Sequence, residues 1–192
     1  MARSKEFEES EVLHKAMHLF WEQGYEKTSM ADLVEHMGIH RRSLYDTFGD
    51  KHALYMQAMN RYAQITNTTL EHGVKRSETA REAIQFIFDL MIEGMDNGPA
   101  GCLYVNAAVE LGLRDNEANA ITTEGFIQAE QMLAKIIQQG QEAGEFVSSR
   151  NADELAESLH NALIGIRVWK RATPDMDKLR RIAKLSMEIL DR

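Results

Sequence analysis

Residues 28–54, TSMADLVEHMGIHRRSLYDTFGDKHAL, contain the clearest structural signal in the chain. Apolar residues recur at helical spacing on both sides of Gly38, which favours two short helices joined by a tight turn. Thr28 or Ser29 can cap the first helix, and the second runs from about 40 to 48. Two short helices joined in this way are the helix-turn-helix arrangement, in which the second helix lies across the first.

Helical patterns continue on both sides of this stretch. Amphipathic periodicity predicts a helix over 5–24 before it, and Asp50 can cap the helix that follows it. The later helices are expected at about 51–73, 78–95, 102–113, 116–143, 153–171 and 175–191. Only two prolines occur in 192 residues, and proline is the strongest helix breaker, so we predict an all-α protein.

The expected organisation is a three-helix helix-turn-helix domain over residues 1–50 and a C-terminal helical bundle over 51–192. The helix at 51–73 would link the two. The predicted bundle would bind an effector and form the dimer contact, a role developed below from a family resemblance.

Composition limits the class of protein. The chain is 44% hydrophobic and 27% charged, it has no apolar run of about 18 residues, and its N-terminus lacks a signal peptide. Its single cysteine rules out an internal disulfide framework and fits a reducing compartment, so we predict a cytoplasmic protein without a membrane partner. A formal net charge of −8 argues against indiscriminate nucleic-acid binding, but it leaves room for a local basic patch.

Positive charge is concentrated where the second short helix begins. The N-terminal end of a recognition helix reaches base edges in the major groove, and this end carries His40, Arg41, Arg42 and Ser43. Arginine can form two hydrogen bonds with guanine, and serine or histidine can reach a base or a phosphate. We therefore predict contacts to double-stranded DNA at this end. The alternative is a solvated basic turn on an ordinary helical bundle.

Few charges would support such binding. Three cations oppose two carboxylates between residues 40 and 52, so affinity would depend on a few well-placed contacts. Tyr45 and Lys51 could hold phosphates beside the recognition helix. A dimer would double the number of contacts.

The same stretch closely resembles the N-terminal DNA-binding domain of TetR-family transcriptional regulators. The matching positions are Thr28, Ser29, Gly38, Ile39, Leu44, Tyr45, Phe48 and Lys51. The resemblance implies a homodimer that reads a palindromic operator, with Thr28 and Ser29 near the DNA backbone. It also implies a C-terminal domain that binds a small effector and changes the spacing of the two reading heads. The chain departs from the family where Val34 and Met37 replace frequent alanines, and where Arg41 and Arg42 replace small residues.

The lone cysteine lies in GPAGCLYVNAAVELG, residues 98–112. This segment resembles a Gly-Cys-Leu segment of a subset of TetR-like regulators, some of which sense electrophiles or oxidants through such a cysteine. Cys102 would lie in the first turn of a helix, where the helix dipole favours a thiolate. The alternative is a small thiol that packs a helix start.

Other candidate sites in the C-terminal part depend on apolar stripes. The large apolar residues that could line an effector pocket are Phe86, Phe88, Met91, Met95, Tyr104, Phe126, Met132 and Trp169. By resemblance, the last two helices would pair across the dimer through Leu159, Leu163, Ile166, Leu179, Ile182 and Ile189. Each stripe could equally close the protomer's own core.

An enzymatic alternative comes from two Glu-x-x-His pairs, Glu11…His14 and Glu157…His160, a spacing found in di-iron helical bundles. With twenty Glu and seven His in 192 residues, chance alone predicts about 0.7 such pairs. Two pairs are therefore unremarkable, and we predict no metal, no cofactor and no catalytic activity. A protein-interaction bundle with a vestigial reading head is a second alternative. The favoured interpretation is a homodimeric repressor released by a small effector or by modification of Cys102.

Overall fold

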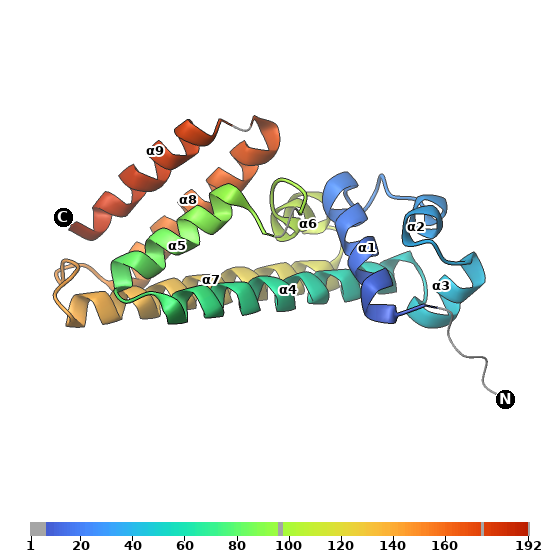
Figure 1. The fold of residues 1–192 in the computed structure, drawn as a ribbon, viewed down its shortest axis with the longest axis horizontal. Helices are drawn as coiled ribbons and strands as arrows, with labels where there is room; N and C mark the ends of the chain where they lie inside the picture. Colours follow the sequence, from blue (N-terminus) through green and yellow to red (C-terminus); the bar gives the residue numbers. More distant parts are fainter. Residues whose placement is uncertain (1–6, 96–97, 174, 192) are drawn as a thin grey trace.

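The computed structural model describes residues 7–95, 98–173 and 175–191, and every regular element in these ranges is a helix, which confirms the all-α prediction (Figure 1). The elements are α1 (Glu9–Gln23), α2 (Met30–Met37), α3 (Arg41–Phe48), α4 (Lys51–Arg76), α5 (Ala80–Glu93), α6 (Leu103–Leu111), α7 (Asn116–Glu142), α8 (Ala152–Ala172) and α9 (Met176–Met187), followed by a 3-10 turn at Glu188–Asp191.

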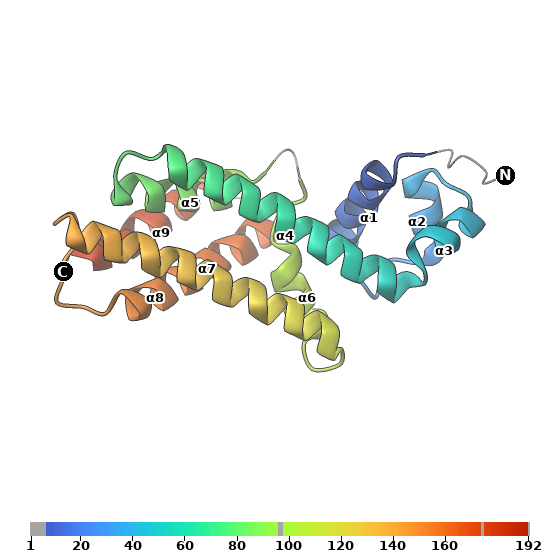
Figure 2. The same ribbon diagram turned by 90° about the horizontal axis from the view of Figure 1, so that it is seen from below.

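The molecule is elongated, as Figures 1 and 2 show. The short helices α1, α2 and α3 form one end. Helix α4 leaves this end and runs toward the far end beside α7. Helices α5 and α8 pack against this pair, and α9 packs against α5 and α8. A displacement at the far end can therefore reach the first three helices through the continuous helix α4.

Side-chain caps explain why most helix starts were predictable. Ser29 and Asp32 form a reciprocal capping box at the start of α2, and Asp50 accepts a hydrogen bond from the Ala53 N–H at the start of α4. Two of the predicted helix bounds were less accurate. Helix α1 begins at Glu9, after residues 7 and 8, and the predicted residues 5 and 6 lie outside the described ranges. Helix α4 continues to Arg76, past the predicted end at 73.

Buried apolar side chains form two clusters. The first joins α1, α2 and α3 to the first half of α4 and to α6, where Leu103, Ala107 and Leu111 are buried. The second lies among α5, α7, α8 and α9. The core beneath the N-terminal helices thus continues past the predicted boundary at residue 50 into α4 and α6.

The predicted dimer residues belong to the second cluster. Leu159, Leu163, Ile166 and Leu179 are at most 6% exposed, and the half-buried Ile182 and Ile189 pack against the same cluster. The structure therefore corrects the dimer assignment of the four buried residues, while for Ile182 and Ile189, which keep exposed surface, it stays a prediction. A helical apolar stripe has the same period whether it faces a partner or the chain's own core, so periodicity could not separate the two.

Candidate functional site

Helix α3 presents a polar face to solvent and an apolar face to the core. His40, Arg41, Arg42 and Tyr45 are exposed, and Ser43 is half-buried. On the opposite face Leu44 and Phe48 belong to the first cluster. The structure therefore brings together the side chains that the sequence placed at the start of the recognition helix.

The two arginines lie outside the core and keep most of their surface free. Arg42 Nε is 3.6 Å from Asp46 Oδ2, and the Arg42 side chain is 92% exposed. The guanidinium of Arg41 lies 5.8 Å from the centre of the Tyr45 ring, within the range of a cation–π contact. Because an exposed ion pair contributes at most about 1 kcal/mol, Asp46 can release Arg42 to a DNA base at low cost.

The turn before α3 depends on a left-handed residue. Gly38 has φ 69° and ψ 31°, and its N–H donates to the carbonyl oxygens of Val34 and Glu35. Glycine adopts this conformation without the steric cost that a Cβ imposes. His40 follows as the N-cap of α3, and its exposed imidazole makes no capping hydrogen bond.

The start of α2 corrects one predicted DNA contact. The Thr28 side chain is fully buried, and its hydroxyl donates to the Gly24 carbonyl oxygen at 2.6 Å, so it supports the end of α1 and does not face DNA. Ser29 is exposed, although its Oγ accepts a hydrogen bond from the Asp32 N–H at 3.1 Å. Hydrogen bonds from Ser29 hold the pKa of Asp32 below its ordinary value.

Lys51 lies just after α3, at the start of α4. Its Nζ lies 4.2 Å from the centre of the Tyr25 ring, at the first turn of α4. The contact fixes the ammonium group close to α3 without neutralising it, because an aromatic ring carries no net charge. The Lys51 ammonium group therefore remains suited to hold a phosphate.

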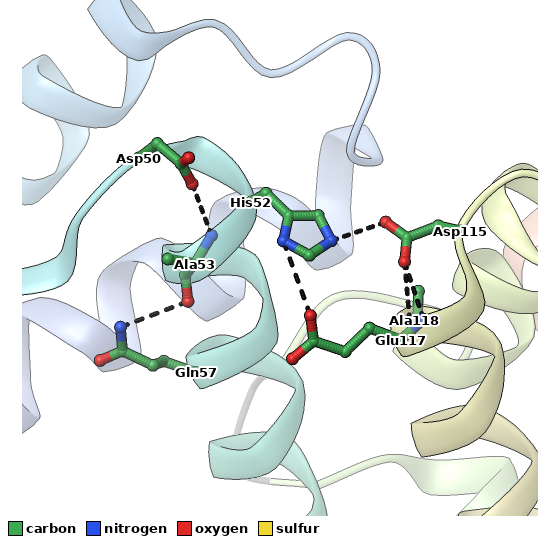
Figure 3. Close-up of polar contacts among 7 residues, drawn as sticks. All are labelled: Asp50, His52, Ala53, Gln57, Asp115, Glu117 and Ala118. Carbon is green, nitrogen blue, oxygen red and sulfur yellow. Dashed lines mark hydrogen bonds and ion pairs between the residues drawn. The ribbon is translucent and has the colours of Figure 1, made fainter.

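Carboxylates from α6 and from the start of α7 contact the N-terminal helices. The Glu110 carboxylate accepts hydrogen bonds from the N–H groups of Tyr25 and Glu26, at 2.9 and 2.8 Å, directly after α1. Figure 3 shows the second contact, in which His52 Nε2 lies 2.7 Å from Asp115 Oδ2. The α6–α7 segment, from the end of α6 to the start of α7, therefore contacts the reading domain, formed by α1, α2, α3 and the first turn of α4, at two points.

Asp115 also caps α7, since its Oδ1 accepts hydrogen bonds from the N–H groups of Glu117 and Ala118 at 3.0 Å (Figure 3). The Ala118 N–H, and then the contact with His52, hold the pKa of Asp115 below its ordinary value. One carboxylate thus fixes a helix start and the first turn of α4.

Asp115→Asn should lower the free energy of unfolding at pH 7 by about 1 kcal/mol, because the amide is a weaker acceptor than the carboxylate. A lowered pKa in the folded state contributes stability above the unfolded pKa of about 3.9. That contribution is lost as pH falls through the folded pKa, so wild type and variant should converge in acid. Urea unfolding between pH 7 and pH 3 measures this, with Glu157→Gln as the control, because the Glu157 side chain is exposed. A difference that does not change with pH would contradict the assignment.

Cys102 lies among aromatic side chains where α1, α4 and α6 meet. It is half-buried at the N-cap of α6, and its Sγ accepts a hydrogen bond from the Tyr62 hydroxyl at 3.3 Å. The Tyr62 ring contacts Trp21 and Tyr104, with ring centres 5.0 and 5.3 Å apart. Burial raises the pKa of Tyr62 well above its ordinary value, so the hydroxyl stays protonated as a donor.

The predicted effector residues do not form one site. Tyr104 and Phe126 lie close to each other beside Cys102, with their ring centres 6.5 Å apart. Phe86 packs in the second cluster against Gly73 of α4. The remaining candidates, Phe88, Met91, Met95 and Met132, are buried or half-buried against the two clusters.

The prediction for Trp169 was wrong. This side chain is 45% exposed, and Lys178 Nζ of α9 lies 3.2 Å from the centre of its ring. It belongs to the outer surface of α8 and α9 and not to an internal pocket. Helical periodicity gives only an approximate direction, and Trp169 lies three residues beyond the buried Ile166, near the edge of the apolar stripe.

Several contacts were missed from sequence. Tyr62, His52 and Glu110 have no distinctive sequence motif, because their partners lie 40 to 85 residues away. Arg167 had a usable signal, since it directly follows Ile166 in the apolar stripe of α8, and it is only 3% exposed. A charged residue at a core position of a helix is uncommon and indicates a specific role.

The Glu-x-x-His pairs have other partners. Glu11 pairs with Lys15 at 3.0 Å, and His160 Nδ1 lies 2.9 Å from Glu130 Oε1, while Glu157 is exposed. Within residues 7–95, 98–173 and 175–191, no three His, Cys, Asp or Glu side chains are grouped to hold a metal ion. In the same ranges, no helix is both long and apolar enough to cross a bilayer.

Two family models match the chain. "Bacterial regulatory proteins, tetR family" matches residues 12–58, and "Tetracyclin repressor-like, C-terminal domain" matches residues 80–185. The uncharacterised HTH-type transcriptional regulator YezE of Bacillus subtilis is 31% identical over the full length of both chains. The HTH-type transcriptional repressor ComR of Escherichia coli is 30% identical, over 97% of this chain and 90% of ComR. These relatives are transcriptional regulators and not enzymes.

Solved structures show the same fold. A cysteine mutant of the TetR-family regulator CifR, complexed with a 26-base-pair operator, superposes with a TM-score of 0.84 at 23% identity, over 98% of this chain and 99% of CifR. The reduced form of NemR from Escherichia coli superposes with a TM-score of 0.83 at 15% identity, over 94% and 95% of the two chains.

Proposed function

The chain belongs to the TetR family of helix-turn-helix transcriptional regulators, and from this premise we propose that it is a homodimeric repressor released by a small effector or by modification of Cys102. The observation that carries the proposal is the exposed face of α3, where Arg41 and Arg42 lie free of the core. Because it would act on operator DNA, the proposal also places the protein in the cytoplasm. Two reading helices, one per protomer, would insert into successive major grooves of a palindromic site.

The dimer contact that we propose uses the outer surface of the last two helices. Val168 and Trp169 of α8 and Leu185 of α9 are 50%, 45% and 64% exposed. Exposed large apolar side chains are typical of protein interfaces, and aromatic residues are enriched there. In this proposal the three exposed residues replace the four buried residues of the sequence prediction.

In the proposed mechanism, His40, Arg41, Arg42 and Ser43 read bases, while Ser29, Tyr45 and Lys51 hold the DNA backbone. Effector binding then acts through the two attachments of the α6–α7 segment. A shift of Glu110 and Asp115 moves the end of α1 and the first turn of α4. An effector can do this only if it binds the two conformations with different affinities.

Binding to the DNA upstream of the protein's own gene tests this function. The purified protein is titrated onto that DNA with excess nonspecific competitor, at several salt concentrations. A competitor-resistant complex with a steep salt slope is expected, because each protomer contributes arginine and lysine contacts to phosphates and bases. The absence of such a complex, for protein freed of small molecules by partial unfolding and refolding, would contradict the proposal.

Cys102→Ser should leave operator affinity unchanged and abolish the response to a thiol-alkylating electrophile. The hydroxyl keeps a hydrogen bond with Tyr62 but is a far weaker nucleophile than a thiolate. N-ethylmaleimide is added to both proteins, and operator binding is measured before and after. An equal response of wild type and variant would end the sensor role and leave Cys102 as a packing residue.

A further inference from the structure

Arg167 of α8 is a buried charge without a counter-charge among the described residues. It is 3% exposed, and its Nη1 donates a hydrogen bond to the Met91 carbonyl oxygen at 3.2 Å. Its Nε and Nη2 are buried and have no partner within the described part of the chain. Isolated buried charges are costly, and a guanidinium cannot shed its proton to escape that cost.

The neighbouring groups are also donors that lack an acceptor. The guanidinium lies 5.9 Å from the centre of the Trp21 ring, and Trp21 Nε1 is buried with no hydrogen-bond partner among the residues that the structure describes. Indole and guanidinium N–H groups can only donate, so only an acceptor can satisfy them. The charge of Arg167 also acts on the pKa of the nearby Tyr62 hydroxyl. This hydroxyl already donates a hydrogen bond to Cys102.

Two further positively charged side chains near Arg167 also favour an anionic acceptor at this place. Lys170 and Arg171, one turn further along α8, also bond to backbone carbonyl oxygens, those of Glu93, Trp21, Glu22 and Ala100. Burial, and then the nearby charge of Arg167, lower the pKa of Lys170. The end of α8 therefore places an excess of positive charge where it meets α1, α5 and the segment before α6.

We propose that Arg167 and Trp21 form an anion-binding subsite for a small carboxylate with an aromatic body. The free Nε and Nη2 lie on one edge of the guanidinium, and that edge matches the two oxygens of a carboxylate. The rings of Trp21, Tyr62 and Tyr104 contact one another in sequence beside this edge, and in the proposal they would receive the aromatic body of the ligand. The identification of this ligand as the effector rests on the proposed function.

The location also gives such a ligand a direct route to the reading domain. Trp21 is the third-last residue of α1, Tyr62 lies in α4, and Cys102 caps α6. An anion between Arg167 and Trp21 would draw α8 and α1 together, because both supply donors to the same group. The position of α1 determines where α2 and α3 lie, since all three share the first cluster.

Calorimetric titration of the full-length protein tests the subsite with matched pairs of probes, benzoate against benzamide and phenylacetate against phenylacetamide. The proteins are wild type, Arg167→Met, and Arg180→Met as a control that removes an exposed arginine paired with Glu93. At least one carboxylate should bind both wild type and the control. The matching amide should bind wild type roughly ten- to a hundredfold more weakly, and the carboxylate should bind Arg167→Met more weakly by a similar factor. Arg167→Gln replaces the methionine variant if that variant does not fold.

Three results would overturn the subsite: equal binding of acid and amide, equal binding by wild type and the Arg167 variants, or binding of no carboxylate in the panel. The upstream DNA experiment, run on the same preparations without probes, separates this failure from that of the proposed function. Specific DNA binding without carboxylate binding would remove only the subsite. Carboxylate binding that leaves DNA affinity unchanged would support the subsite and remove it from regulation.

Discussion

Leu44→Ala should lower the free energy of unfolding by about 2–5 kcal/mol, the range observed when a buried leucine is truncated in a packed core. Leu44 has no exposed surface, and it lies on the face of α3 that packs against α2 and α4. Helix α3 spans only eight residues, too few to be stable without tertiary contacts. The cavity beneath it should therefore loosen the whole reading helix, and operator affinity should fall together with stability.

Tyr45→Ala is the matched control, because Tyr45 is the next residue of the same helix and is 42% exposed. Its truncation should cost less than about 1 kcal/mol of stability. Urea unfolding of the full-length proteins, at one fixed protein concentration, measures the free energy of unfolding of both variants. Equal destabilisation by the two substitutions would mean that α3 does not pack on Leu44 as described.

The reading domain was predictable because its signals are local. The cap residues Ser29 and Asp50, and the glycine at 38 with positive φ, each act within a few residues of their position in the chain. The side of α3 that faces the core follows from the spacing of Leu44 and Phe48. Such features need no knowledge of the rest of the fold, so helix bounds and the candidate DNA contacts could be stated from sequence.

The contacts that could not be predicted join distant parts of the chain. Thr28 fits a helix start equally well with an exposed or a buried hydroxyl, and only the packing of α1 decides between them. The leucines of α8 have the same periodicity in a core as in an interface. The burial of Arg167 had a signal in the sequence, but its unpaired Nε and Nη2 did not, because they depend on which helices pack against α8.

The strength of operator binding should depend on the two arginines at the start of α3. In the free protein Arg42 interacts only weakly with Asp46, at 3.6 Å, so little is lost when it turns toward a base. A bidentate arginine–guanine contact discriminates by about 1–3 kcal/mol, and a dimer makes it twice. We therefore expect each reading helix to make few strong contacts, so that the loss of one should reduce specificity measurably.

Arg42→Ala should weaken binding to the specific operator by about 1–3 kcal/mol per half-site, or about 2–6 kcal/mol for the dimer, if Arg42 pairs with a base. Asp46→Ala is the matched control, since it releases Arg42 without removing it and should leave affinity unchanged or slightly increased. Affinities are measured for the operator and for a scrambled duplex across a salt series. A loss confined to the operator identifies base reading. An equal loss on both duplexes, with a salt slope reduced by about one per protomer, would instead make Arg42 a phosphate contact, because counterion release does not depend on sequence.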